Sequence, residues 1–201
     1  MRGDEVTDEN IVSNPPSIGI LGIDPGFASI GWGVVCVYRD LPVEFVTGGI
    51  LHTMQADKKS NTSAPADNFR RCREISLALR KLMFDFGIRL IAAEAMSFPR
   101  SASVAAKMAM TWGAISMLSV VHDPVAVLQA TPQTIKRTTT GMTGATKKDV
   151  ETALVLKYPA LGQLLAGIKP EDHEHLADAV GAIEVVLQSD EVRLMRSMLG
   201  P

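Results

Sequence analysis

The sequence predicts an α/β protein built on one mixed five-stranded sheet with helices on both faces. Short apolar segments joined by brief polar links open the chain, which is typical of an antiparallel meander. Segments with helical spacing then alternate with two further apolar strands, as in βα units. The 201 residues, 46% of them hydrophobic, suffice for one domain with a substantial core.

The meander is expected to contain three strands, at residues 17–24, 30–38 and 43–51. The first is largely apolar up to its final Asp24, as expected for a strand buried on both faces. Pro25-Gly26 turns the chain into the second strand. The third contains Gly48-Gly49, which indicates a bulge or close packing.

Helices and two more strands are expected after a polar loop at residues 52–65. Their ranges are a helix at 66–86, a strand at 89–94, a helix at 102–121, a strand at 124–129, and helices at 132–136, 146–158 and 173–188. Thr131 and Thr146 are suitable N-caps for two of these helices. In the first helix, Arg70, Arg71 and Arg73 are expected to be solvated. Residues 159–170 are expected to form a loop.

The predicted domain covers residues 17–190, between an acidic leader at 1–16 and a C-terminal tail at 191–201. The net charge is −2, of which residues 1–9 contribute −3, so DNA binding requires that the cations cluster on one face. The N-terminus lacks the features of a signal peptide. No apolar segment approaches the ~20 residues that span a bilayer. We therefore expect an intracellular, cytoplasmic protein that does not bind membranes.

Four side chains could converge on one cleft. Asp24 and Glu94 each end an apolar strand, although each alone fits an ordinary turn or strand end. His175 and Asp178 are three residues apart and share a helical face. Such donors suit two hard divalent cations about 4 Å apart around a scissile phosphate. One cation would polarise the attacking water and the other would stabilise the leaving 3′-oxygen, so the set predicts a metal-dependent nuclease.

The order of these motifs resembles the RuvC family of Holliday-junction resolvases, which have a ribonuclease H-like fold. The similarity covers roughly residues 18–187. Its segments are Ile20-Leu-Gly-Ile-Asp-Pro-Gly26 with Gly31-Trp-Gly33, Ala93-Glu94 with a Ser- and Ala-rich helix reaching Gly113, Thr131 to Thr140, Ala145-Thr-Lys-Lys148, and His175-Leu-Ala-Asp-Ala-Val-Gly-Ala182. The order of the five is more specific than any one of them.

The resemblance implies that the catalytic metal ligands are Asp24, Glu94, His175 and Asp178. Many family members have Asp where His175 stands and some have His; a histidine ligand favours Mn²⁺ over Mg²⁺. Two Mg²⁺ or Mn²⁺ ions are expected in each active site. The implied activity is the cleavage of four-way DNA junctions by paired symmetric nicks.

The resemblance also implies DNA contacts. Lys136 and Lys147 are expected to contact phosphates, and Arg137 and Lys148 flank the same Gly- and Thr-rich loop. The family often has an aromatic residue shortly after its Glu. Here Phe98 is the nearest one, one residue out in an ungapped match, and ordinary packing before Pro99 is its alternative role. Arg100 beside it is a further candidate contact.

A homodimer is implied as well, and the Ala- and Met-rich helix at 102–121 could form an isologous contact. Four other functions are consistent with parts of the pattern: a broader branched-DNA endonuclease that cuts flaps and forks, a non-catalytic nucleic-acid-binding relative, an RNA-processing nuclease, and an actin-like phosphotransferase. The short chain argues against the phosphotransferase. The sequence identifies neither a helicase partner nor a preferred cut sequence.

Overall fold

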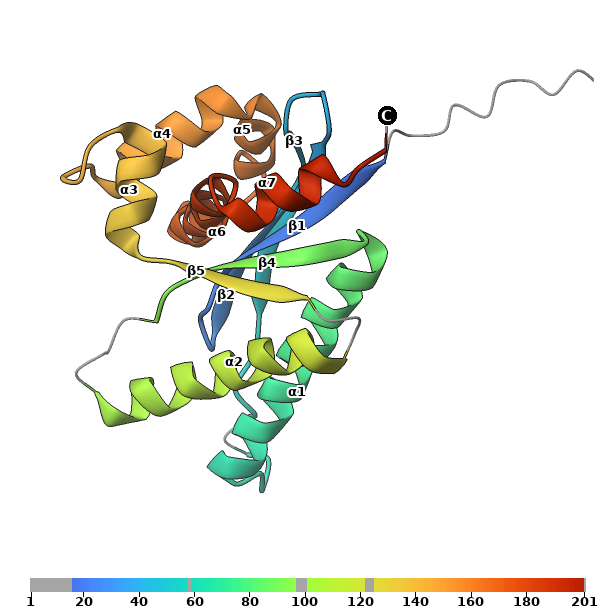
Figure 1. Cartoon of the computed structure of the whole chain (residues 1–201). Helices are drawn as coiled ribbons and strands as arrows, with labels where there is room; N and C mark the ends of the chain where they lie inside the picture. Colours follow the sequence, from blue (N-terminus) through green and yellow to red (C-terminus); the bar gives the residue numbers. More distant parts are fainter. Residues whose placement is uncertain (1–15, 58, 97–100, 122–124, 201) are drawn as a thin grey trace, which may run out of the picture.

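A computed structural model describes residues 16–57, 59–96, 101–121 and 125–200 (Figure 1). Its single sheet has the strand order β3-β2-β1-β4-β5. The strands are β1 Ser17–Asp24, β2 Ser29–Tyr38, β3 Glu44–His52, β4 Ile88–Glu94 and β5 Ala126–Ala130. The first three pair antiparallel, whereas β4 runs parallel to both β1 and β5. The predicted mixed five-stranded sheet is confirmed, and the expected leader lies almost wholly outside the described residues.

Helices cover both faces of the sheet, as predicted (Figure 1). On one face lie α1 Ala64–Asp85 and α2 Ala102–Val121. On the other lie α3 Pro132–Thr140, α4 Lys147–Lys157, α5 Pro159–Leu165, α6 His173–Val186 and α7 Asp190–Ser197, with a short 3₁₀ turn at Pro170–Asp172 before α6. Within the described ranges, no helix combines the length and apolar character needed to cross a membrane.

The central strand β1 is buried on both faces, which explains its apolar composition. Ile18 and Ile20 pack toward α6, whereas Leu21 and Ile23 pack toward α1 and α2. Alternate side chains of a strand point to opposite faces, so one strand contributes to two cores. Asp24, the last residue of β1, is polar and partly exposed, whereas the six residues before it are buried.

Helix α6 can lie close to the sheet because two strand residues beneath it, Gly22 and Gly31, are glycines. A Cβ atom at Gly31 of β2 would lie 1.9 Å from the backbone oxygen of His175. A Cβ atom at Gly22 of β1 would lie 2.2 Å from the backbone oxygen of Ala179. Any other residue would push the helix away, so these glycines set the height of α6 above the strand ends.

The C-terminal third contains two helices that we did not predict. Residues 159–165, expected as part of a loop, form α5 with Pro159 in its first turn and Leu161 and Leu165 buried. A proline is compatible with a helix at this position because its missing N–H has no intrahelical partner there. The expected tail contains α7, which Ser189 caps and which buries Val192 against the core.

The expectation that Arg71 is solvated is wrong. Only 4% of the residue is exposed, and its Nε donates to Thr53 Oγ1 at 2.9 Å. Its position explains the burial, because Arg71 lies four residues before Ile75 and eight before Leu79 on the buried stripe of α1.

Candidate metal centre

Three acidic residues meet at one edge of the sheet. Asp24 ends β1 and Glu94 ends the neighbouring parallel strand β4, so both carboxylates lie at the same edge. Asp178 reaches them from the second turn of α6. One carboxylate oxygen from each residue lies within 4.8 Å of the other two. The structure therefore brings together three of the four predicted ligands.

His175, the fourth predicted ligand, lies beside this cluster and contacts one of its members. Its Nδ1 is 2.6 Å from Oδ2 of Asp24, and the imidazole is partly buried. This hydrogen bond, with the nearby charges of Asp24 and Glu174, raises the pKa of His175 above its usual 6.5 although burial opposes the shift. The imidazole therefore orients the Asp24 carboxylate.

The three carboxylates repel one another in a partly buried site. Burial, together with the charges of Asp178 and Asp24, raises the pKa of Glu94 to about 8. Burial also raises the pKa of Asp178, although Lys147 opposes the shift. Clustered hard oxygen donors whose charge is poorly compensated suit a divalent cation such as Mg²⁺ or Mn²⁺. The residues present thus fit the metal centre that the sequence predicts.

Lys147 lies over the acidic cluster at the start of α4. Its Nζ is 3.1 Å from Glu174 Oε2 and 3.4 Å from Asp178 Oδ2. A reciprocal capping box between Thr146 and Asp149 fixes the first turn of α4. It therefore also fixes the backbone position from which the Lys147 side chain extends. The sequence alone did not indicate the contact with Glu174. Glu174 precedes Asp178 by one helical turn, which places both on one face.

The other predicted DNA contacts lie in different settings. The Lys148 ammonium pairs with Glu151 at 2.6 Å on the same helix. Arg137 lines a hollow with the loop that joins α3 to α4. Lys136 is partly buried on α3. Phe98 and Arg100 lie outside the described residues.

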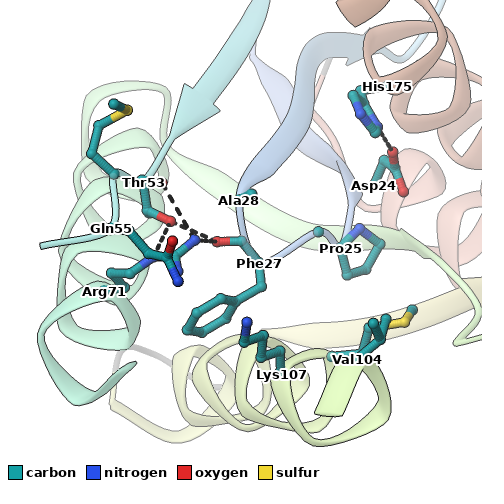
Figure 2. A pocket seen from close by; sticks show the side chains of 13 residues that line it. Asp24, Pro25, Phe27, Ala28, Thr53, Gln55, Arg71, Val104, Lys107 and His175 are labelled. Atoms are coloured by element: carbon teal, nitrogen blue, oxygen red, sulfur yellow. Dashed lines mark hydrogen bonds and ion pairs between the residues drawn. The ribbon is translucent and has the colours of Figure 1, made fainter. Parts of the chain in front are cut away.

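A cavity of about 690 Å³ adjoins the acidic cluster (Figure 2). Asp24 and His175 lie at one end of it, and the wall continues through Phe27 to Arg71 of α1. Val104 and Lys107 of α2 complete it on another side. The sequence did not predict this cavity, because its wall comes from segments far apart in the chain.

The family model and the similar proteins identify the same family. The family model described as "Crossover junction endodeoxyribonuclease RuvC" matches residues 20–186. The RuvC protein of Natranaerobius thermophilus is 26% identical over 180 residues, covering 90% of this chain and 99% of that protein. The RuvC protein of Pseudothermotoga lettingae is 30% identical over 132 residues, covering 66% of this chain and 75% of that protein.

Solved structures support the same fold. Thermus thermophilus RuvC in complex with a Holliday junction substrate superposes with a TM-score of 0.66 at 23% identity, covering 89% of this chain and 97% of that one. The yeast mitochondrial Holliday junction resolvase superposes with a TM-score of 0.62 at 14% identity, covering 92% of this chain and 86% of that one. The predicted ribonuclease H-like fold is confirmed. This chain belongs to the crossover junction endodeoxyribonuclease RuvC family.

Proposed function

We propose that this protein is a divalent-metal-dependent endonuclease that cleaves four-way DNA junctions by paired symmetric nicks. The observation that carries the proposal is the meeting of Asp24, Glu94 and Asp178 within 4.8 Å, in a chain that matches the RuvC family model over residues 20–186. The relatives named above carry the corresponding activity in their names. The proposed location of the protein is inside the cell, in the cytoplasm.

The proposed ligand set for two Mg²⁺ or Mn²⁺ ions is Asp24, Glu94 and Asp178, with His175 as the fourth donor. The raised pKa values of Glu94 and Asp178 support it, because a cation would relieve the repulsion between their carboxylates. When bound, such ions supply Lewis-acid stabilisation of the phosphate charge and lower the pKa of the attacking water. The expected products are a 5′-phosphate and a 3′-hydroxyl.

The protein's own side chains have distinct tasks in this proposal. Lys147 faces the acidic cluster, so its ammonium can offset the negative charge that develops on the scissile phosphate. His175 keeps the Asp24 carboxylate oriented through its Nδ1. Lys136, Arg137 and Lys148 are proposed contacts to the DNA backbone around the same site. Phe98 and Arg100 are the proposed contacts of the segment that follows β4.

A homodimer is the proposed assembly, because two symmetric nicks require two active sites. The face of α2 that points away from the core exposes Met117 and Val120, at 54% and 70%. Small exposed residues, Ala106, Ala109 and Gly113, continue this face and permit close helix approach. Met117→Glu should convert the protein to a monomer in light-scattering measurements. Leu156→Glu on α4, also at an exposed apolar residue, should leave the dimer intact.

The deciding experiment compares end-labelled four-way junctions, flaps, forks and linear duplexes with Mg²⁺ or Mn²⁺. Paired nicks confined to the four-way junction support the proposal. Cutting spread across flaps and forks would replace it with a broader branched-DNA nuclease. No metal-dependent cutting of any DNA would overturn it, and RNA substrates would then be tested.

A further inference from the structure

We propose that the cavity beside the acidic cluster receives an unstacked nucleobase of the cleaved strand, next to the scissile phosphate. The inference rests on the proposed nuclease function and adds a base-reading site to it. The cavity measures about 690 Å³, within the range of small-molecule sites. Asp24 and His175 form part of its wall, so a base joined to a phosphate held at Asp24 has direct access to it (Figure 2).

The wall near the acidic cluster is mainly apolar. Pro25 and Phe27 line it from the β1–β2 turn, and Val104 and Met108 line it from α2. Aromatic and thioether groups offer polarizable surfaces for the faces of a planar base. A phosphate in the same place would lose its hydration without enough donors to replace it. The chemistry of this wall therefore favours a base over a second phosphate.

A buried cation lies at the far end of the cavity. Arg71 is 4% exposed and donates to neutral oxygens only, from Nε to Thr53 Oγ1 and from Nη2 to the backbone oxygens of Phe27 and Thr53. Its guanidinium carbon lies 4.3 Å from the centroid of the Phe27 ring. Asp67, one turn earlier on α1, pairs with Arg70 at 2.6 Å instead. Among the described residues, Arg71 thus makes no direct ion pair with a carboxylate, although its charge and that of Asp67 still interact at longer range.

A guanidinium buried without a carboxylate is costly unless further acceptors complete its bonding. The described hydrogen bonds use Nε and Nη2 of Arg71, so Nη1 is the nitrogen that remains for a ligand. A base carbonyl is a suitable acceptor, as in the arginine contacts that read guanine O6. The cavity should therefore prefer guanine, thymine or cytosine, each of which has a carbonyl, over adenine, which has none.

The cavity opens at its outer end toward a polar surface. Gln55 and Lys107 line both the cavity and an adjoining hollow that includes Thr62, Asn68 and Ser103. Lys107 can therefore meet the backbone of the inserted nucleotide while the base lies inside. Extruding a base costs least where stacking is already broken, as at the branch point of a junction. The cavity would thus direct cleavage to the branch point, where a base is most easily extruded, and to positions whose base fits the cavity.

The first test uses four-way junctions in which each nucleotide flanking the cut is changed in turn to guanine, thymine, cytosine, adenine or an abasic residue. Wild-type protein should cut junctions with guanine, thymine or cytosine at one flanking position about tenfold faster than those with adenine or no base. Val104→Trp and Met108→Trp, which fill the cavity, should each remove this preference. Leu156→Trp, at an exposed residue of α4, should retain it.

A second readout does not depend on cleavage. Wild-type protein is bound to junctions with Ca²⁺ in place of Mg²⁺, and a fluorescent guanine analogue that is quenched by stacking occupies the flanking position. Its emission should rise on binding, whereas an analogue placed inside one arm should not respond.

The outcomes separate the two proposals. Equal cutting of all flanking bases, or an unchanged preference in both tryptophan variants, would overturn the base pocket and leave the nuclease standing. An unresponsive flanking analogue would likewise count against the pocket. A wild-type protein that cuts no junction would overturn the proposed function, and the pocket with it.

Discussion

The side chains of His175 and Asp24 are hydrogen-bonded at 2.6 Å although 151 positions separate them in the chain. Because the carboxylate favours the charged imidazole, the pKa of His175 is raised in the cation-free protein. Asp24→Asn should lower this pKa, which NMR titration of the imidazole protons measures directly. The pairing contributes stability below the unfolded-state pKa of the imidazole, and this stability is lost as pH rises through the raised value. An unchanged pKa in the variant would contradict the coupling.

Asp24→Asn should also abolish junction cleavage while preserving junction binding. The substitution removes a charged oxygen donor from the proposed metal centre, so the rate should fall about a thousandfold or more, equivalent to about 4 kcal/mol. Binding should persist or strengthen, because the variant carries one negative charge fewer beside the phosphates. Single-turnover cleavage and gel-shift measurements separate the two effects. Asp40→Asn, at a side chain that is 84% exposed, provides the matched control.

Cation binding should release a proton from Glu94 near neutral pH. With a pKa of about 8, this carboxyl is largely protonated at pH 7 in the cation-free protein. A cation competes with that proton, so Mn²⁺ affinity should rise with pH up to about 8 and then level off. Calorimetry in buffers of different ionisation enthalpy counts the released protons. Glu94→Gln should reduce the number of protons released, whereas His175 and Asp178, whose pKa values are also raised, still contribute. A flat wild-type profile would contradict the assignment.

The raised pKa of Glu94 also predicts how the free energy of unfolding depends on pH. The pKa of Glu94 is higher in the folded chain than its usual 4.5, so the folded chain holds a proton that the unfolded chain has released. The free energy of unfolding of the cation-free protein should therefore decrease as pH rises from about 5 to about 8. Added Mg²⁺ or Mn²⁺ should restore stability at the upper end. Thermal melts with and without cation at several pH values provide the measurement.

Lys147→Met should reduce cleavage about 10- to 100-fold through loss of the charge near the scissile phosphate. It should also reduce the slope of log affinity against log salt by about 0.9 if the ammonium neutralises one phosphate. Lys81→Met serves as the control, because that lysine is exposed and pairs with Asp85 on α1. A salt slope identical to that of wild type would show that Lys147 makes no phosphate contact.

Gly31→Ala should lower both stability and activity. The new Cβ atom would lie 1.9 Å from the backbone oxygen of His175, so α6 must move away from β2. Overpacking of this kind typically costs about 1–3 kcal/mol. Chemical denaturation and Mn²⁺ titration should show reduced stability and weaker cation binding. Gly167→Ala, where the nearest atom would lie 3.5 Å away, should behave like wild type.

The sheet and the acidic cluster were predictable because both follow from local signals. Apolar runs bounded by turns marked all five strands, and Asp24 and Glu94 were identified as strand-end carboxylates. The helix spacing placed His175 and Asp178 on one face. That Nδ1 of His175 faces Asp24 depends on how closely α6 packs on the strands, which the sequence does not specify by itself.

The misses have physical causes as well. Residues 159–165 contain Pro159 and Gly162, which favour a loop, yet the burial of Leu161 and Leu165 outweighs these local preferences. Ser189 and the apolar spacing of Val192, Met195 and Leu199 could have indicated α7. Arg71 was misjudged from its charge alone, although the four-residue spacing to Ile75 placed it on the buried stripe.

The close seating of α6 on Gly22 and Gly31 also bears on how the protein is made. Asp24 and Glu94 leave the ribosome well before Asp178, which is carried by a helix near the end of the described chain. Until α6 is synthesised, the strand glycines have no helix to cover them and the two carboxylates lack their third partner. The emerging chain therefore cannot assemble the acidic cluster, and no competent nuclease can form before α6 has left the ribosome.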